Sequence, residues 1–310
     1  VGVEYEDDKG RIHQARARAE IVLCAGAYNS TPLLEMSGVG RADLLESLGV
    51  QKLHELPGVG ENLQDHFQLW LQQGVKTKNT LSEDGKFPRL VFNVLRYLLP
   101  KKGALAFPAA NIGAFVRSER GGRPIFQIHF TPGAGKMDEE GNMVASEKPG
   151  VNSTCCVIRP TSRGSVHARS LDPKEAPRIL HNFLETEHDR ELSIEGFKLQ
   201  RKIYAQPAFQ EQATEELVPG PSVQSDEEIL DFWKEEGMSV YHPVGSAKMG
   251  AVDDPTAVVD NELRVHGLQG LRIADASIFP LLPSGNTHAP TVAVAEKAAD
   301  LILGKPAVRG

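Results

Sequence analysis

Apolar and polar residues alternate along the start of the chain, and this pattern predicts two strands joined by a turn. Residues 1–5 (VGVEY) are extended, and residues 7–10 (DDKG) have the composition of a turn. Residues 12–23 alternate again and end in an apolar run, which the small residues 25–27 follow at once. A buried strand that stops at small residues suits a close approach of backbone or ligand at its carboxyl end.

Helical patterns recur along the rest of the chain. Ser30, Thr31 and Pro32 predict the start of a helix, because a hydroxyl cap is followed by a proline in the first turn. Ser225 with Glu228 predicts another start, a capping box. We expect further helices over residues 42–48, 87–99, 185–205, 226–236 and 291–303.

The middle of the chain predicts an antiparallel sheet. Residues 125–130 (IFQIHF) alternate like a strand with one solvated face, and residues 153–159 form a second apolar run. Residues 162–164 are a turn that leads into a third strand at 165–168, which we expect to neighbour the second. Trp70 and Trp233 are candidates for the core. Candidates for a substrate pocket are Phe107, Phe126, Gln127, His129 and Phe130.

Composition narrows the class of protein without deciding it. The chain has 310 residues and a net charge of −7 with both signs interspersed, which gives no support for nucleic-acid binding. No apolar run approaches the roughly 20 residues that span a bilayer, and the first residues do not form a signal peptide. Cys24, Cys155 and Cys156 match no zinc pattern, so we expect buried thiols and no metal.

Four segments carry fixed combinations of small, aliphatic and polar residues. Residues 26–40 read GAYNSTPLLEMSGVG, and residues 56–66 read LPGVGENLQDH. Residues 241–250 read YHPVGSAKMG, so that His242 precedes Pro-x-Gly. Residues 267–291 hold GLQGLRIADASIFP and then GNTHAPT, in which His288 lies just before a predicted helix.

Together these segments resemble those of the glucose-methanol-choline (GMC) oxidoreductases, FAD-dependent enzymes that oxidise alcohols. The resemblance implies an α/β (α+β) fold: the C-terminal portion of a doubly wound FAD-binding domain, from residues 1–66 and 237–310, and an antiparallel-sheet substrate domain from residues 67–236. The family's Gly-x-Gly-x-x-Gly fingerprint is absent from the sequence; Gly58-Val59-Gly60 lacks the third glycine and a leading strand. We therefore expect an N-terminal FAD-binding polypeptide to supply the first half of the enzyme. Because a targeting signal would be expected in that first half, the cellular compartment is unknown.

The resemblance also implies which residues form the site. His242 is the expected base, since the ordinary pKa of histidine suits proton transfer near neutral pH. His288 is its expected partner on the substrate oxygen, and the two roles could be exchanged. Expected contacts to FAD come from Gly26, Asn29, Asn62, Asp275, Ala276, His288, Ala289 and Pro290.

The implied function is oxidation of a small-molecule alcohol to a carbonyl, with hydride transfer to the flavin. The resemblance leaves the alcohol and the electron acceptor open. A lyase or a photodecarboxylase of the same fold is one alternative, and retention of both His242 and His288 favours alcohol oxidation over it. The other alternative is a catalytically silent subunit that completes a heteromer.

Overall fold

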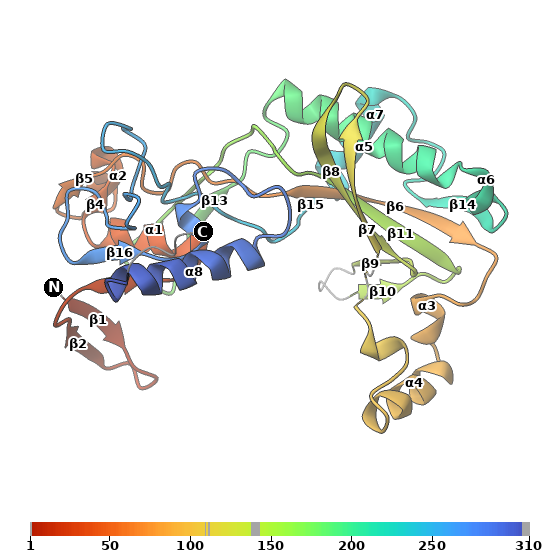
Figure 1. The fold of residues 1–310 in the computed structure, drawn as a ribbon, viewed down its shortest axis with the longest axis horizontal. Helices are drawn as coiled ribbons and strands as arrows, with labels where there is room; N and C mark the ends of the chain where they lie inside the picture. Colours follow the sequence, from red (N-terminus) through yellow and green to blue (C-terminus); the bar gives the residue numbers. More distant parts are fainter. Residues whose placement is uncertain (1, 109, 111, 138–142, 306–310) are drawn as a thin grey trace. The chain divides into compact units, whose positions relative to one another are not determined.

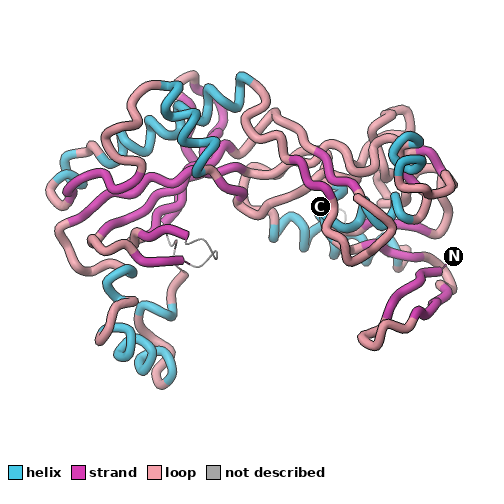
Figure 2. Tube along the Cα trace, turned by 180° about the vertical axis from the view of Figure 1, so that it is seen from behind, coloured by secondary structure: helices cyan, strands magenta, loops and turns pink. Residues whose placement is uncertain are grey.

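The structure, a computed structural model, describes residues 2–108, 110, 112–137 and 143–305. The chain divides into two compact units, shown in Figures 1 and 2. Unit 1 consists of Val1–Asp65, Pro160–Glu185 and Tyr241–Gly310, and unit 2 of His66–Arg159 and Thr186–Val240. Each unit is thus assembled from segments that lie far apart in the sequence.

Unit 1 is built from short elements joined by long loops. Its elements are β1 (Gly2–Glu6), β2 (Ile12–Arg16), β3 (Ile21–Leu23), α1 (Gly26–Met36), β4 (Val39–Gly40), α2 (Ala42–Ser47), β5 (His54–Glu55), β12 (Ser165–His167), β13 (Arg178–Leu180), β16 (Leu271–Ile273), the 3₁₀ turn η2 (Ala276–Ile278) and α8 (His288–Ile302). The expected hairpin at the N-terminus is present, since β1 and β2 pair antiparallel.

The centre of unit 1 is the parallel pair of β3 and β16. Leu23 lies opposite Ile273, and the backbone N–H of Ala274 donates to the Leu23 carbonyl at 2.9 Å. Around this pair lies an apolar core that includes Leu34 of α1, Val259, Ile273 and Ile278. Helix α1 therefore packs on a sheet whose two strands come from opposite ends of the chain.

Unit 2 is a six-stranded antiparallel sheet with helices on one face, which Figure 1 shows. The strands run in the order β14-β6-β11-β8-β7, and β15 also pairs with β6. Its elements are β6 (Phe67–Val75), α3 (Leu81–Asp84), α4 (Arg89–Leu98), η1 (Ala104–Ala106), β7 (Ile112–Ser118), β8 (Gly121–Thr131), β9 (Gly135–Met137), β10 (Met143–Ala145), β11 (Gly150–Val157), α5 (Glu187–Tyr204), α6 (Pro207–Gln210), β14 (Ala213–Val218), α7 (Asp226–Glu236) and β15 (Met238–Ser239).

Helix α5 lies close against the sheet because it has a glycine at the contact. A Cβ added to Gly196 would lie 3.0 Å from the Cys155 sulfur and 3.3 Å from the Phe126 ring. Phe126 is fully buried in this core, so it is not a pocket-lining residue. Trp233 of α7 is buried as expected, at 1% exposure.

Most of the predicted helices are present, but the start of α1 differs from the prediction. The helix begins at Gly26 and contains Pro32 in its interior, whereas the Ser30-Thr31-Pro32 pattern placed the start four residues later. Gly26 has φ +80°, which lets the chain turn into the helix directly after β3. Helix α8 likewise begins at His288, earlier than the predicted residue 291.

Two other predictions also need correction. The strand at 165–168 does not neighbour the one at 153–159: β12 pairs with β13 in a separate two-stranded sheet. Its segment, Pro160–Glu185, belongs to unit 1, although the sequence-based division assigned it to the substrate domain. The physical reason is that β12 packs on α1. His167 of β12 is hydrogen-bonded to Glu35 of α1.

Cys155 and Cys156 are buried as expected, while Cys24 is exposed. Among the described residues, no helix is both long enough and apolar enough to cross a lipid bilayer.

Replacing Gly196 with Val should lower the free energy of unfolding by about 1–3 kcal/mol, because the added methyl groups overpack the contact with Cys155 and Phe126. Chemical unfolding measures this. Lys202→Val is the matched control, a β-branched residue on the exposed side of the same helix. Equal stability of the two variants would contradict the close helix–sheet contact.

Candidate catalytic and cofactor site

A single carboxylate in unit 1 joins the loops that follow β3 and β16. Asp275 Oδ2 accepts from the Gly26 backbone N–H at 2.9 Å and from the Ser30 hydroxyl at 2.5 Å. Its Oδ1 accepts from the Ser277 backbone N–H at 2.8 Å, which caps η2. Asp275 is only 6% exposed, so both oxygens are used inside the protein to fix the two turns.

The same loops present open backbone at the carboxyl ends of the two parallel strands. Apart from its chain neighbours and the backbone of its own helix, no heavy atom of the described residues lies within 4 Å of the position that a Cβ would take on Gly26. In sheets of this kind, ligands bind outside the carboxyl ends of the strands, where a helix N-terminus can face an anionic group. The geometry at Gly26 therefore fits a bound dinucleotide such as FAD.

The segment that carries His242 is tied to these loops by its backbone. The Ala247 N–H donates to the Ser277 carbonyl at 2.8 Å, and the Gly245 N–H donates to the Ala276 carbonyl at 3.2 Å. The fully buried Ser246 hydroxyl donates to the Ala27 carbonyl at 2.6 Å. This network holds the His242 segment beside the carboxyl ends of both β3 and β16.

His242 is 8% exposed and is positioned from two sides. Its backbone N–H donates to Asp65 Oδ1 at 2.9 Å. Its Nε2 lies 3.2 Å from Asn286 Nδ2. An amide nitrogen can only donate, so Nε2 is the acceptor in this contact and carries a lone pair. A neutral imidazole with a lone pair on Nε2 can accept a proton there.

Asn62 and Gln64 brace the same segment from a third loop. Asn62 adopts the left-handed backbone conformation, with φ 62°, and its Nδ2 donates to the Gly245 carbonyl at 3.1 Å. Gln64 Oε1 accepts from the Leu282 N–H at 3.1 Å, and its Nε2 donates to the Pro280 carbonyl at 3.2 Å. The loop after β5 therefore links the His242 segment to the chain that leads to Asn286.

A second histidine of unit 1 is held between two carboxylates. His167 Nδ1 lies 2.6 Å from Glu35, and its Nε2 lies 3.3 Å from Glu61. Glu35 is fully buried and also accepts from the Ala168 N–H at 2.7 Å. Burial acts to lower the pKa of His167, but the hydrogen bonds and charges of Glu35 and Glu61 outweigh it and raise the pKa to about 9.

Comparison with known proteins decides the family. Two family models, both described as GMC oxidoreductase, match residues 1–68 and 160–295. An oxygen-dependent choline dehydrogenase from Chromohalobacter salexigens is 43% identical over 98% of this chain. The chain belongs to the GMC oxidoreductase family. The resemblance drawn from the four sequence segments is thereby confirmed.

Other GMC oxidoreductases agree with this assignment. The human mitochondrial choline dehydrogenase is 42% identical over 99% of this chain. Formate oxidase from Aspergillus oryzae, whose solved structure concerns FAD modification, shares the fold with a TM-score of 0.90 at 24% identity, over 98% of this chain and 57% of that one. The chain spans about half the length of the two dehydrogenases, 54% and 51%. The predicted mixed α/β fold with an antiparallel sheet is confirmed.

The structure of this GMC oxidoreductase chain places the predicted site residues in different surroundings. Gly26, Asp275 and Ala276 lie at the strand ends, and Asn62 contacts the His242 segment. Asn29 is exposed on α1. His288 and Ala289 are exposed at the start of α8, and Pro290 follows them in the first turn of that helix. Convergence of His242 with His288 stays a prediction.

Sequence reasoning did not name Asn286, the residue in contact with His242 Nε2. The signal for it was present, because residues 285–288 (GNTH) contain both an asparagine and a histidine just before the predicted helix, and either side chain can form a hydrogen bond there.

The His167 contacts should make stability depend on pH. The folded-state pKa of about 9 lies above the unfolded value of about 6.5, so the contribution is complete below pH 6.5 and is lost as the pH rises through 9. We expect His167→Gln to cost about 2 kcal/mol more stability at pH 6 than at pH 9.5, measured by chemical unfolding. The exposed His188→Gln is the control, and an equal cost at both pH values would contradict the charged contact.

Proposed function

We propose that this chain forms the C-terminal half of an FAD-dependent enzyme that oxidises an alcohol to a carbonyl. The observation that carries the proposal is the contact of His242 Nε2 with Asn286 Nδ2, which leaves a histidine lone pair directed at an amide donor. A base and a hydrogen-bond donor side by side are what an alcohol oxygen needs when it loses its proton.

The residues at the strand ends suit FAD as the cofactor. The backbone at Gly26 and Ala276 would hold it, together with Ala289 and Pro290 in the first turn of α8. FAD would supply the chemistry of accepting the hydride from the alcohol carbon. Asp275 would act indirectly, since its carboxylate already fixes Gly26 and η2.

His242 would take the hydroxyl proton at Nε2. Asp65, which accepts from the His242 backbone N–H, would fix the position of the residue through its main chain. Asn286 or His288 would hold the substrate oxygen by a hydrogen bond. Proton transfer of this kind contributes about 10²- to 10⁴-fold to a rate. Choline is the first alcohol to test, because the relatives named above are choline dehydrogenases.

The remaining part of the flavin site would come from sequence outside these 310 residues. Within the described part of the chain, β3 and β16 pair only with each other, which is too narrow for a doubly wound sheet. Further strands, in the same polypeptide or in a partner, would complete the sheet and carry the dinucleotide fingerprint. A silent subunit would have no need of the His242–Asn286 contact, so we favour the catalytic role.

Replacing His242 with Ala in the complete enzyme should slow reduction of the flavin by about 10²-fold or more, because the base is lost. Anaerobic stopped-flow absorbance with choline measures the rate, and the flavin spectrum shows whether FAD is retained. His288→Asn should have a smaller effect, since Asn can still hydrogen-bond the oxygen. His13→Ala, in β2, is the matched control. An unchanged rate for His242→Ala with FAD bound would exclude it as the base.

The 310-residue chain by itself, supplied with FAD and choline, should show no turnover, because the β3–β16 pair lacks the strands that complete the nucleotide site. Oxidation assayed with an artificial electron acceptor tests this. The same chain joined to the preceding half of the enzyme is the control. Full activity of the 310 residues alone would refute the proposal that half the flavin site lies elsewhere.

A further inference from the structure

Helix α4 of unit 2 exposes its apolar residues. Of the ten residues from Arg89 to Leu98, only Asn93 is buried. Apolar side chains that are exposed on the helix or directly after it are Leu90, Val91, Phe92, Val94, Leu95, Tyr97, Leu98 and Leu99. An amphipathic helix of a globular domain normally buries its apolar stripe, so this helix has the opposite arrangement.

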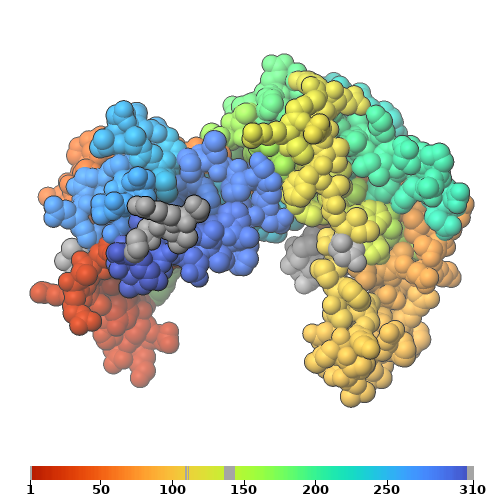
Figure 3. All heavy atoms as spheres, viewed as in Figure 1, coloured from red at the N-terminus to blue at the C-terminus, as the bar shows by residue number. Residues whose placement is uncertain are grey.

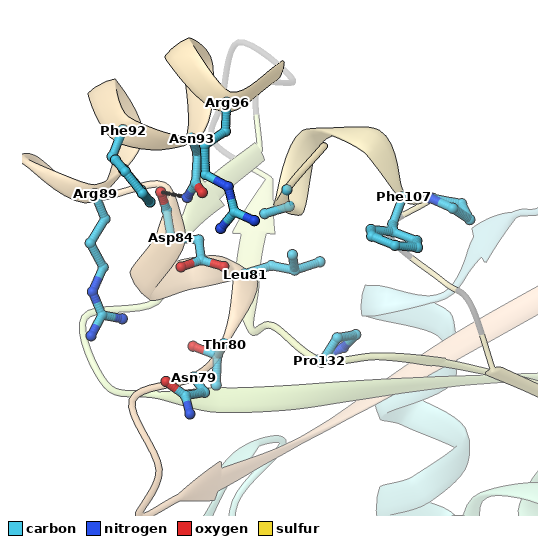
Figure 4. A pocket seen from close by; sticks show the side chains of 13 residues that line it. Asn79, Thr80, Leu81, Asp84, Arg89, Phe92, Asn93, Arg96, Phe107 and Pro132 are labelled. Atoms are coloured by element: carbon cyan, nitrogen blue, oxygen red, sulfur yellow. Dashed lines mark hydrogen bonds between the residues drawn. The ribbon is translucent and has the colours of Figure 1, made fainter. Parts of the chain in front are cut away.

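The polar stripe of α4 faces inward. Arg89, Asn93 and Arg96 follow the i, i+4, i+7 spacing of one helix face, and all three line a cavity of about 500 Å³, shown in Figure 4. Asn93 Nδ2 donates to the Asp84 carbonyl at 3.2 Å, and an Arg89 guanidinium nitrogen donates to the Lys78 carbonyl at 2.7 Å. These contacts hold the polar face of α4 toward α3. The exposed apolar side chains of α4, which we call the apolar arc, therefore point away from α3.

The exposed surface continues beyond the helix. Phe87, which precedes α4 in the chain, is 85% exposed, and Phe107, which follows η1, is 69% exposed. Figure 3 shows the orange and yellow atoms of this segment as a projection at the end of unit 2. We call residues 86–107 the α4 segment. Apolar surface of this extent, concentrated on one projection, marks an interaction site.

The charge of the α4 segment is opposite to that of the chain. It carries five cations, Lys86, Arg89, Arg96, Lys101 and Lys102, and no Asp or Glu, whereas the whole chain has a net charge of −7. The Lys101 ammonium lies 5.0 Å from the centre of the Tyr97 ring, and the Arg96 guanidinium lies 5.5 Å from that of Phe92. Lys101 thus lies against an aromatic ring on the exposed surface, whereas the Arg96–Phe92 pair lies at the edge of the cavity.

We propose that the α4 segment binds the surface of an anionic lipid bilayer. A helix with aromatic and aliphatic residues on one arc and Lys and Arg around it lies in the plane of the headgroups, with its apolar arc in the acyl boundary. Basic residues next to that arc are attracted to anionic headgroups. The chain attaches from one side in this mode, which requires no spanning helix. This inference goes beyond the proposed oxidation and does not depend on it.

Charge complementarity favours lipid over protein as the occupant. A second copy of this chain would bring its own exposed Lys101 and Lys102 to the same surface, and like charges facing each other oppose that contact. A covering protein segment would have to supply acidic residues for both lysines. An anionic bilayer supplies the negative charge and the apolar boundary together.

Co-sedimentation of the complete protein with vesicles tests the proposal. We expect binding to phosphatidylcholine vesicles that contain phosphatidylglycerol and weak binding to phosphatidylcholine alone. Lys101→Glu with Lys102→Glu should weaken the binding by roughly tenfold or more, because two attractive charges become repulsive. Leu95→Glu with Leu98→Glu should also weaken it, since the apolar arc no longer inserts. Lys198→Glu with Lys202→Glu, the same charge change on α5, is the matched control.

The melting temperature and the molecular mass in solution of each variant are measured as well. Leu95 and Leu98 are 52% and 59% exposed, so their replacement should leave the melting temperature unchanged. A large fall in melting temperature would mean that protein covers the arc, and conversion of a dimer to a monomer would identify a second copy as the occupant. Either result overturns the proposal, as does vesicle binding that the Lys101/Lys102 variant leaves intact.

Discussion

The candidate site depends on one buried carboxylate. Asp275 receives hydrogen bonds from Gly26 and Ser30, which follow β3, and from Ser277, which follows β16. A buried charge is stable only when hydrogen bonds satisfy it, so the three donors and the carboxylate require each other. Removal of the charge would take from both turns the hydrogen-bond acceptor that they share.

The position of His242 follows from this junction. The η2 carbonyls that Asp275 holds in place accept the backbone N–H groups of Gly245 and Ala247, and Ser246 reaches across to α1. His242 precedes these anchored residues by only a few positions. The main-chain position of His242 is therefore set by hydrogen bonds of the neighbouring backbone together with the Ser246 hydroxyl.

Sequence reasoning was most successful where the signal is local. The capping box of Ser225 and Glu228 is present in the structure, and so is helix α4, which was predicted over residues 87–99. The start of α1 was missed because the distant Asp275 fixes it. The partner of β12 was missed because a strand's own sequence does not specify its neighbour. Asn286 was passed over because only the fold shows which of two polar residues in one loop contacts His242.

The parallel pairing of β3 with β16 has a consequence for the order of folding. Gly26 and Asp275 are 249 positions apart in the chain. During synthesis, β3 and α1 leave the ribosome long before the strand that completes their sheet, whereas every segment of unit 2 has been made once Val240 is added. Domains generally fold as units as the chain emerges. The pairing of β3 with β16 can therefore form only after residues 271–273 have been synthesised, when every segment of unit 2 is already present.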